Sequence, residues 1–341
     1  MVLDKNTSVY LKGFAVLFMM FLHFGDLHVM PQYRWSWSGN CWNSAFQICV
    51  PMFLFLSGYG LTISQMKNEQ NIKTQYKKAL VRVFKLLQKY WFAIFPFIVI
   101  GLFTNVFSFS PYELFINITT LKPTWCGPAW FVFLYIELVF LYPIIFNCIK
   151  HFKTSLVLLV FAFVIILTKL LMKIDYIDSE ATIFARQIKM LMIDSPIFIE
   201  GVLFAYYSIF EKFKCEKIFL NIVLGLALCI IAIFMRAKVP LISIHELLHV
   251  PLCLIGLMLL IKIGQQFSSI FIFIGHHSTT LWFIHTYFCW TFLQPLVYHI
   301  RIDFVSFVLF VLISVFVSIL IDFLYKKIII TYSCKNINHR K

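Results

Sequence analysis

The sequence predicts an all-α, polytopic membrane protein with about ten transmembrane helices in one bundle. Of its 341 residues, 61% are hydrophobic and 13% are charged, whereas soluble domains carry about 25% charged residues. The apolar residues, which include 40 phenylalanines, come in long blocks rather than in amphipathic stripes. A net charge of +14 therefore indicates the cytoplasmic loops of a membrane protein, and we expect no nucleic-acid partner.

A helix needs about 20 residues to cross the hydrocarbon core of a bilayer, and ten segments meet or approach that length. The expected spans are 10–29, 45–64, 90–107, 128–147, 154–172, 193–209, 217–235, 246–263, 269–290 and 303–325. Pro96 and Pro196 interrupt the third and the sixth of them. Long polar extensions and repeats are missing from the sequence, which predicts a single membrane domain over residues 1–341 with no soluble extension.

The distribution of positive charge predicts the orientation of the chain. With ten spans both termini lie on one side, and most of the 29 Lys and Arg residues then fall on that side. Residues 73–89 alone contribute six of them and no acidic residue. Because cytoplasmic loops are enriched in Lys and Arg, we expect an integral plasma (inner) membrane protein with both termini in the cytoplasm.

His23 is the most informative polar residue inside an expected span. A charged group at mid-bilayer costs at least about 2.5 kcal/mol, and the residues before His23 are otherwise apolar. Asp26 follows three positions later, so a continuing helix would place both side chains on one face. A carboxylate that orients an imidazole suits a general base acting on a hydroxyl. The alternative is a histidine that only fixes helix packing.

A basic inner rim is the second candidate feature. Arg82 and Lys85 lie between two expected spans, three positions apart, so in a helical conformation they would point the same way and could bind the phosphates of a nucleotide together. Lys12 lies eleven residues before His23, which corresponds to about 16 Å along a helix. The alternatives are positive-inside topology for Arg82 and Lys85, and snorkelling of Lys12 to the membrane surface.

Several other polar residues in the expected spans are candidates for lining a cavity. Ser57 precedes Gly58 and is equally suited to close helix packing. Ser278 and His285 are seven positions apart and lie on nearly one helix face, where a helix–helix hydrogen bond is the alternative. Glu137 is a membrane carboxylate that needs a partner.

The order of these landmarks resembles the acyltransferase 3 family of integral-membrane acyltransferases. In that family the first span carries an arginine, ten residues and a histidine, and here the same spacing reads Lys12-x10-His23. The other matching segments, in chain order, are Phe53-Leu-Phe-Leu-Ser-Gly-Tyr59, Arg82-Val-Phe-Lys85, Trp130-Phe-Val-Phe-Leu134 and Ser278 through His285. Lysine replaces arginine at positions 12 and 85, which keeps the charge but loses the planar fork.

The resemblance implies an enzyme that takes an acyl group, usually acetyl, from cytoplasmic acyl-CoA. It implies transfer to a hydroxyl of a cell-surface glycan or of its lipid-linked precursor. We then expect His23 and Asp26 to be catalytic and Lys12, Arg82 and Lys85 to bind CoA. Ser57, Trp130, Glu137, Ser278 and His285 are expected to line the cavity. Acyl-CoA, a sugar acceptor and the lipid bilayer are the expected partners.

Two other functions stay open. An exporter of polysaccharide or lipid-linked sugar would use Glu137, Glu200 and Asp322 as a polar pathway, although paired broken spans are not evident. An intramembrane zinc protease would use the HExxH pattern at His245, Glu246 and His249. Pro251 follows closely and a third ligand is not evident, so we expect no metal.

Overall fold

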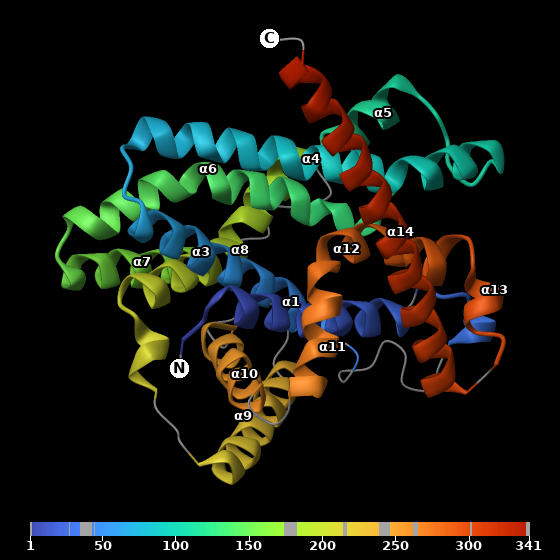
Figure 1. Cartoon of the computed structure of the whole chain (residues 1–341). Coiled ribbons are helices and arrows are strands. Elements are labelled where there is room, and N and C mark those ends of the chain that lie inside the picture. Colours follow the sequence, from blue (N-terminus) through green and yellow to red (C-terminus); the bar gives the residue numbers. More distant parts are fainter. Residues whose placement is uncertain are drawn as a thin grey trace.

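The computed structural model describes residues 2–26, 28–34, 43, 45–173, 183–213, 217–238, 246–261, 265–300 and 302–338. Every regular element in these ranges is helical, which confirms the all-α class (Figure 1). The α-helices in these ranges are α1 (Lys5–Phe24), α3 (Cys49–Lys67), α4 (Ile72–Phe103), α5 (Pro111–Ile118), α6 (Trp130–His151), α7 (Thr154–Lys173), α8 (Ile183–Tyr206), α9 (Ile218–Lys238), α10 (Glu246–Leu260), α11 (Gln265–His276), α12 (Ser278–Thr286), α13 (Gln294–Val297) and α14 (Asp303–Asn338).

Six of the described helices are long and apolar enough to cross a membrane, so the expected count of about ten is not confirmed. They cover Lys5–Phe24, Phe46–Lys67, Ile72–Phe103, Gly127–His151, Ile218–Lys238 and Asp303–Ile328. The expected span 269–290 is divided between α11, α12 and a π-helical turn, Tyr287–Thr291. The expected span 246–263 corresponds to α10, which has only 15 residues. Mean hydropathy along the sequence does not separate such broken or short helices from continuous spans.

The basic stretch that we expected to form an inner loop is instead the first half of a long helix. Helix α4 runs without a break for 32 residues and contains this stretch and the third expected span up to Phe103. Asn71 caps its N-terminus by accepting a hydrogen bond from the backbone N–H of Thr74 at 2.9 Å. Pro96 lies inside the same helix without ending it. Arg82 and Lys85 are therefore held on a rigid element, at the helical spacing that the sequence suggested.

Glycines let two pairs of helices cross at close range. A Cβ atom at Gly58 of α3 would collide with the carbonyl oxygen of Phe198 on α8, and a Cβ atom at Gly201 of α8 would collide with that of Phe55 on α3. Helices α1 and α11 cross in the same reciprocal way at Gly13 and Gly275. Such contacts are typical of small-residue packing between membrane helices.

Helix α1 lies at the centre of the bundle (Figure 1). Its first half packs into an apolar core shared with α3, α6, α8 and α10, and its second half into a core shared with α4, α12 and α14. Helices α9 and α10 pack against each other below α1 in the view of Figure 1. The two candidate positions on α1, Lys12 and His23, therefore face different parts of the molecule.

Candidate active site

Two histidines from distant parts of the chain meet inside the bundle. His23 lies in the last turn of α1 and His285 near the end of α12. Nδ1 of His23 is 2.6 Å from Nε2 of His285. The two rings are stacked, with their centroids 4.9 Å apart and an interplanar angle of 14°. His285 is fully buried and His23 is half-buried, so the hydrogen bond lies at the edge of the buried interior.

The partners of this pair define which nitrogen carries each hydrogen when both rings are neutral. Nδ1 of His285 is 2.8 Å from the carbonyl oxygen of Leu281. A carbonyl only accepts, so Nδ1 of His285 is the donor and its Nε2 is left with a lone pair. Nδ1–H of His23 then donates to that lone pair, and Nε2 of His23 keeps the free lone pair. The geometry thus prepares Nε2 of His23 to accept a proton.

The π-helical turn after α12 holds the backbone of His23. The indole Nε1–H of Trp290 donates to the carbonyl oxygen of His23 at 2.9 Å, and the Trp290 ring packs edge-on against the imidazole with centroids 4.7 Å apart. The ring of His28 stacks on Trp290 at 4.7 Å. Sequence reasoning missed Trp290 and His28, because both contacts depend on how α1 packs against the segment after α12.

Asp26 does not make the contact with His23 that we expected. Helix α1 ends at Phe24 and Gly25 caps it, so the helical i, i+3 relation fails between positions 23 and 26. Oδ1 of Asp26 instead accepts hydrogen bonds from Nδ1 of His28 at 2.8 Å and from the His28 backbone N–H at 3.1 Å. His285 takes the place beside His23 that the sequence suggested for Asp26.

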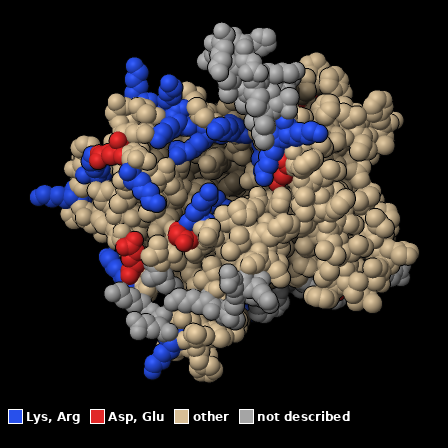
Figure 2. Space-filling model, viewed as in Figure 1, with Lys and Arg blue, Asp and Glu red and all other residues tan. Residues whose placement is uncertain are grey.

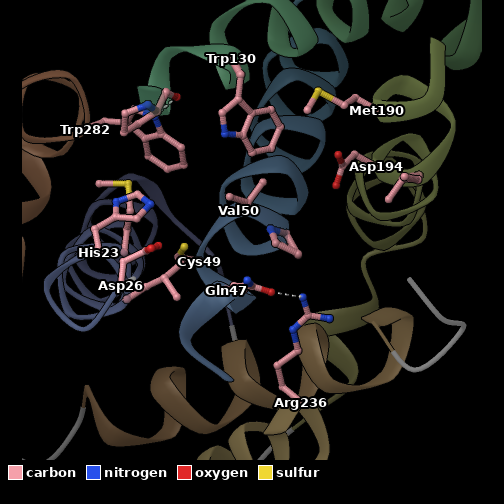
Figure 3. A pocket seen from close by; sticks show the side chains of 15 residues that line it. His23, Asp26, Gln47, Cys49, Val50, Trp130, Met190, Asp194, Arg236 and Trp282 are labelled. Carbon is pink, nitrogen blue, oxygen red and sulfur yellow. Dashed lines mark hydrogen bonds between the residues drawn. The ribbon is translucent and has the colours of Figure 1, made fainter. Parts of the chain in front are cut away.

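His23 and Asp26 both line a cavity of about 330 Å³ (Figure 3). We call it the His23 cavity. In the view of Figure 3, Trp130 and Trp282 lie above, Asp194 lies on the side opposite His23, and Gln47 and Arg236 lie below. The remaining lining residues are Met19, Leu22, Cys49, Val50, Pro51, Pro128, Met190 and Ile193. The cavity thus combines aromatic faces with carboxylate, amide and guanidinium groups.

Arg236 and Asp194 are polar residues of this cavity that sequence reasoning missed. Both are buried, at 5% and 8% exposure. Arg236 lies in the last turn of α9, just beyond the expected span, and its Nη2 donates to Oε1 of Gln47 at 3.2 Å. Asp194 on α8 fell at the start of an expected span. A carboxylate at such a position is itself a signal of function.

A second cavity, of about 390 Å³, brings together five of the predicted site residues. They are Lys12, Ser57, Arg82, Lys85 and Ser278, from four different helices. We call this the basic cavity; Phe53, Leu86, Phe131, Val132, Tyr135, Thr279, Trp282 and Phe283 complete its lining. Figure 2 shows Lys and Arg side chains gathered over α4 and beside α14, around a central hollow. A cluster of three cations in one cavity suits an anionic ligand.

Helix α12 connects the two cavities. Ser278 and Thr279, at its start, line the basic cavity, and His285, near its end, holds His23. Trp282 lies between them and lines both cavities. From Ser278 to His285 the helix rises by about 10 Å. The basic cavity and the histidine pair thus lie at opposite ends of one short helix.

The other predicted residues lie elsewhere. Trp130 lines the His23 cavity, whereas Glu137 on α6 and the buried Glu200 on α8 line neither cavity. Asp322 of α14 pairs with Nζ of Lys89 at 3.2 Å and with Nδ1 of His277 at 2.6 Å, which ties α14 to α4 and to the α11–α12 junction.

His245, the first residue of the HExxH pattern, lies outside the described residues, and His249 is buried in α10. Within the described part of the chain, no three His, Cys, Asp or Glu residues cluster in a way that could hold a metal ion.

A family model described as an acyltransferase domain, Acyl_transf_3, matches residues 9–323. The chain belongs to this membrane acyltransferase family. The matched region of the acyltransferase includes every residue that lines either cavity. Comparisons with curated proteins and with solved structures give no match.

Proposed function

We propose that this acyltransferase transfers an acyl group, in the simplest case acetyl, from acyl-CoA to a hydroxyl group of a glycan or of its lipid-linked precursor. The observation that carries the proposal is that the basic cavity and the His23 cavity adjoin the same helix, α12, and share the lining residue Trp282. The first provides cations for a phosphorylated donor, and the second provides a proton acceptor for a hydroxyl acceptor.

The donor is assigned to the basic cavity. CoA carries several phosphates, and Lys12, Arg82 and Lys85 offer three positive charges around one space. The apolar remainder of the lining, from Phe53, Phe131 and Phe283 among others, suits the uncharged arm that carries the thioester. We therefore place the phosphates at the open basic rim and the thioester toward Trp282.

The acceptor is assigned to the His23 cavity. A sugar ring presents hydroxyl groups together with flat apolar faces. Asp194, Gln47 and Arg236 supply hydrogen-bonding groups on the walls, and Trp130 and Trp282 supply aromatic faces. Cavities that combine apolar walls with a few directed polar groups are typical small-molecule sites.

The chemistry then needs one proton transfer and one exchange of bonds at the thioester carbon. The acceptor oxygen attacks the carbonyl carbon, and Nε2 of His23 takes the hydroxyl proton. The carbon–sulfur bond breaks, the thiolate leaves, and it recovers the proton from His23 as free CoA. The products are an O-acyl ester and CoA–SH, and His23 returns to its starting state. His285 acts through His23 and is a positioning residue.

We place the donor on the cytoplasmic side of the plasma membrane, where acyl-CoA is available. Lys12 and His23 are eleven residues apart on the single helix α1, or about 16 Å. This separation fits a donor that enters from one membrane surface and an acceptor that lies deeper or toward the other surface.

Incubation of the purified protein with labelled acetyl-CoA and extracted cell-surface glycan tests the proposal. We expect label on the glycan, in an ester that mild base removes, and no such label from the His23→Ala variant. Failure of the wild-type protein to transfer label from acetyl-, propionyl- or butyryl-CoA to any glycan fraction would overturn the assignment.

A further inference from the structure

Trp282 is the side chain common to the basic cavity and the His23 cavity. It lies on α12 and is only 5% exposed. Of the residues that line either cavity, it is the one that lines both, so its indole forms part of the wall between them.

The indole ring is fixed in this wall. Its Nε1–H donates to the carbonyl oxygen of Pro128 at 2.9 Å, just before α6. One side packs on Phe131 of α6, with ring centroids 4.7 Å apart, and Phe53 of α3 meets it edge-on at 4.9 Å. Helices α3, α6 and α12 therefore all hold the ring. A side chain packed in this way keeps one conformation and a defined volume.

We propose that Trp282 limits the length of the acyl chain that the enzyme transfers; this inference rests on the proposed function. With the phosphates of the donor at Lys12, Arg82 and Lys85, the thioester has to present its carbonyl carbon to an acceptor beside His23. The acyl chain continues from that carbon and needs space at the boundary between the cavities. The indole of Trp282 occupies this space, so a short chain fits and each added methylene meets the ring.

The expected size of the effect follows from how enzymes discriminate between chain lengths. One methylene more or less in an apolar pocket changes kcat/KM by about 10- to 200-fold. Replacing the indole by a smaller side chain opens the boundary, and the penalty for a longer chain decreases. The three cations of the basic cavity stay in place, because the substitution removes none of them.

The test compares acetyl-, propionyl-, butyryl- and hexanoyl-CoA as donors for the wild-type protein, Trp282→Phe and Trp282→Ala. We expect the butyryl-to-acetyl ratio of kcat/KM to rise at least about tenfold in Trp282→Ala, with Trp282→Phe in between. Trp91→Ala is the matched control. The indole of Trp91 on α4 also donates to a backbone oxygen, that of Ile118 at 3.0 Å, but lines neither cavity. This control should keep the wild-type ratio.

The wild-type protein gives a second test that does not depend on the folding of a variant. Hexanoyl-CoA should inhibit acetyl transfer competitively at concentrations near the KM of acetyl-CoA, yet be transferred at least about 100-fold more slowly. Equal transfer of both donors, or an unchanged chain-length ratio in an active Trp282→Ala, would overturn the inference alone. Absence of transfer from every donor would overturn the proposed function, and the inference with it.

Discussion

The hydrogen bond between the two histidines makes a specific prediction for His285. Substitution by leucine removes the acceptor for Nδ1–H of His23, which now lies 2.6 Å from Nε2 of His285. This hydrogen bond strengthens in the transition state, when His23 becomes an imidazolium, and a hydrogen bond from a charged group contributes about 1–3 kcal/mol there. At about 1.36 kcal/mol for each factor of ten in rate, this corresponds to a decrease in kcat of about 5- to 150-fold. The KM for acetyl-CoA should change little, because the donor is assigned to the other cavity.

Glutamine at the same position is the control for a merely structural role. Its side-chain amide oxygen reaches close to the place of Nε2 and accepts the same hydrogen bond. His285→Gln should therefore recover most of the activity that His285→Leu loses, although it forfeits the bond to Leu281. The assay is transfer of labelled acetyl at varied acetyl-CoA concentration. Wild-type kcat in the leucine variant, or equal losses in both variants, would refute this reasoning.

Three further predictions concern the basic cavity and the packing of the bundle. Arg82→Ala should raise the KM for acetyl-CoA about tenfold by removing a charge-assisted contact, whereas Lys77→Ala, exposed on the same helix α4, should leave KM unchanged. Asp322→Asn should lower the free energy of unfolding by about 3 kcal/mol, because Lys89 and His277 lose their buried anionic partner. Gly58→Ala should cost about 1–3 kcal/mol by forcing α3 and α8 apart.

Matched variants separate these effects from general damage. Gly60 on α3 has open space around it, so Gly60→Ala should be neutral or should stabilise the helix by up to about 1 kcal/mol. Glu69 pairs with Lys150 at the surface, where its side chain is 61% exposed, and Glu69→Gln should change stability by less than about 1 kcal/mol. Thermal unfolding in detergent measures all four stabilities. Equal losses of stability in Gly58→Ala and Gly60→Ala, or in Asp322→Asn and Glu69→Gln, would contradict the packing argument.

Spacing within one helix was sufficient to predict part of the site. Arg82 and Lys85 share a cavity because the chain around them is helical. Of Ser278 and His285, which we expected to line a cavity, only Ser278 lines one, whereas His285 contacts His23 instead. The same logic failed for Asp26. The helix stops at Phe24, and a helical relation between positions 23 and 26 holds only if the helix continues.

Contacts between distant segments were beyond the reach of the sequence. His23 and His285 are 262 positions apart, and Gln47 and Arg236 are 189 apart. Periodicity shows that each residue belongs to an apolar segment but not which segments are neighbours. The expected number of spans is not confirmed for a related reason, since an apolar segment has the same composition whether its helix is continuous or broken, as it is between α11 and α12.

The most direct measurement of the central claim compares wild-type protein and His23→Ala for two quantities, the rate of label transfer from acetyl-CoA and the affinity for acetyl-CoA. His23 lines the His23 cavity, to which the acceptor is assigned, and not the basic cavity, so the dissociation constant of acetyl-CoA should stay the same. The transfer rate should fall by about 100-fold or more, as expected for loss of a general base. Transfer at the wild-type rate by a correctly inserted His23→Ala protein would contradict the account.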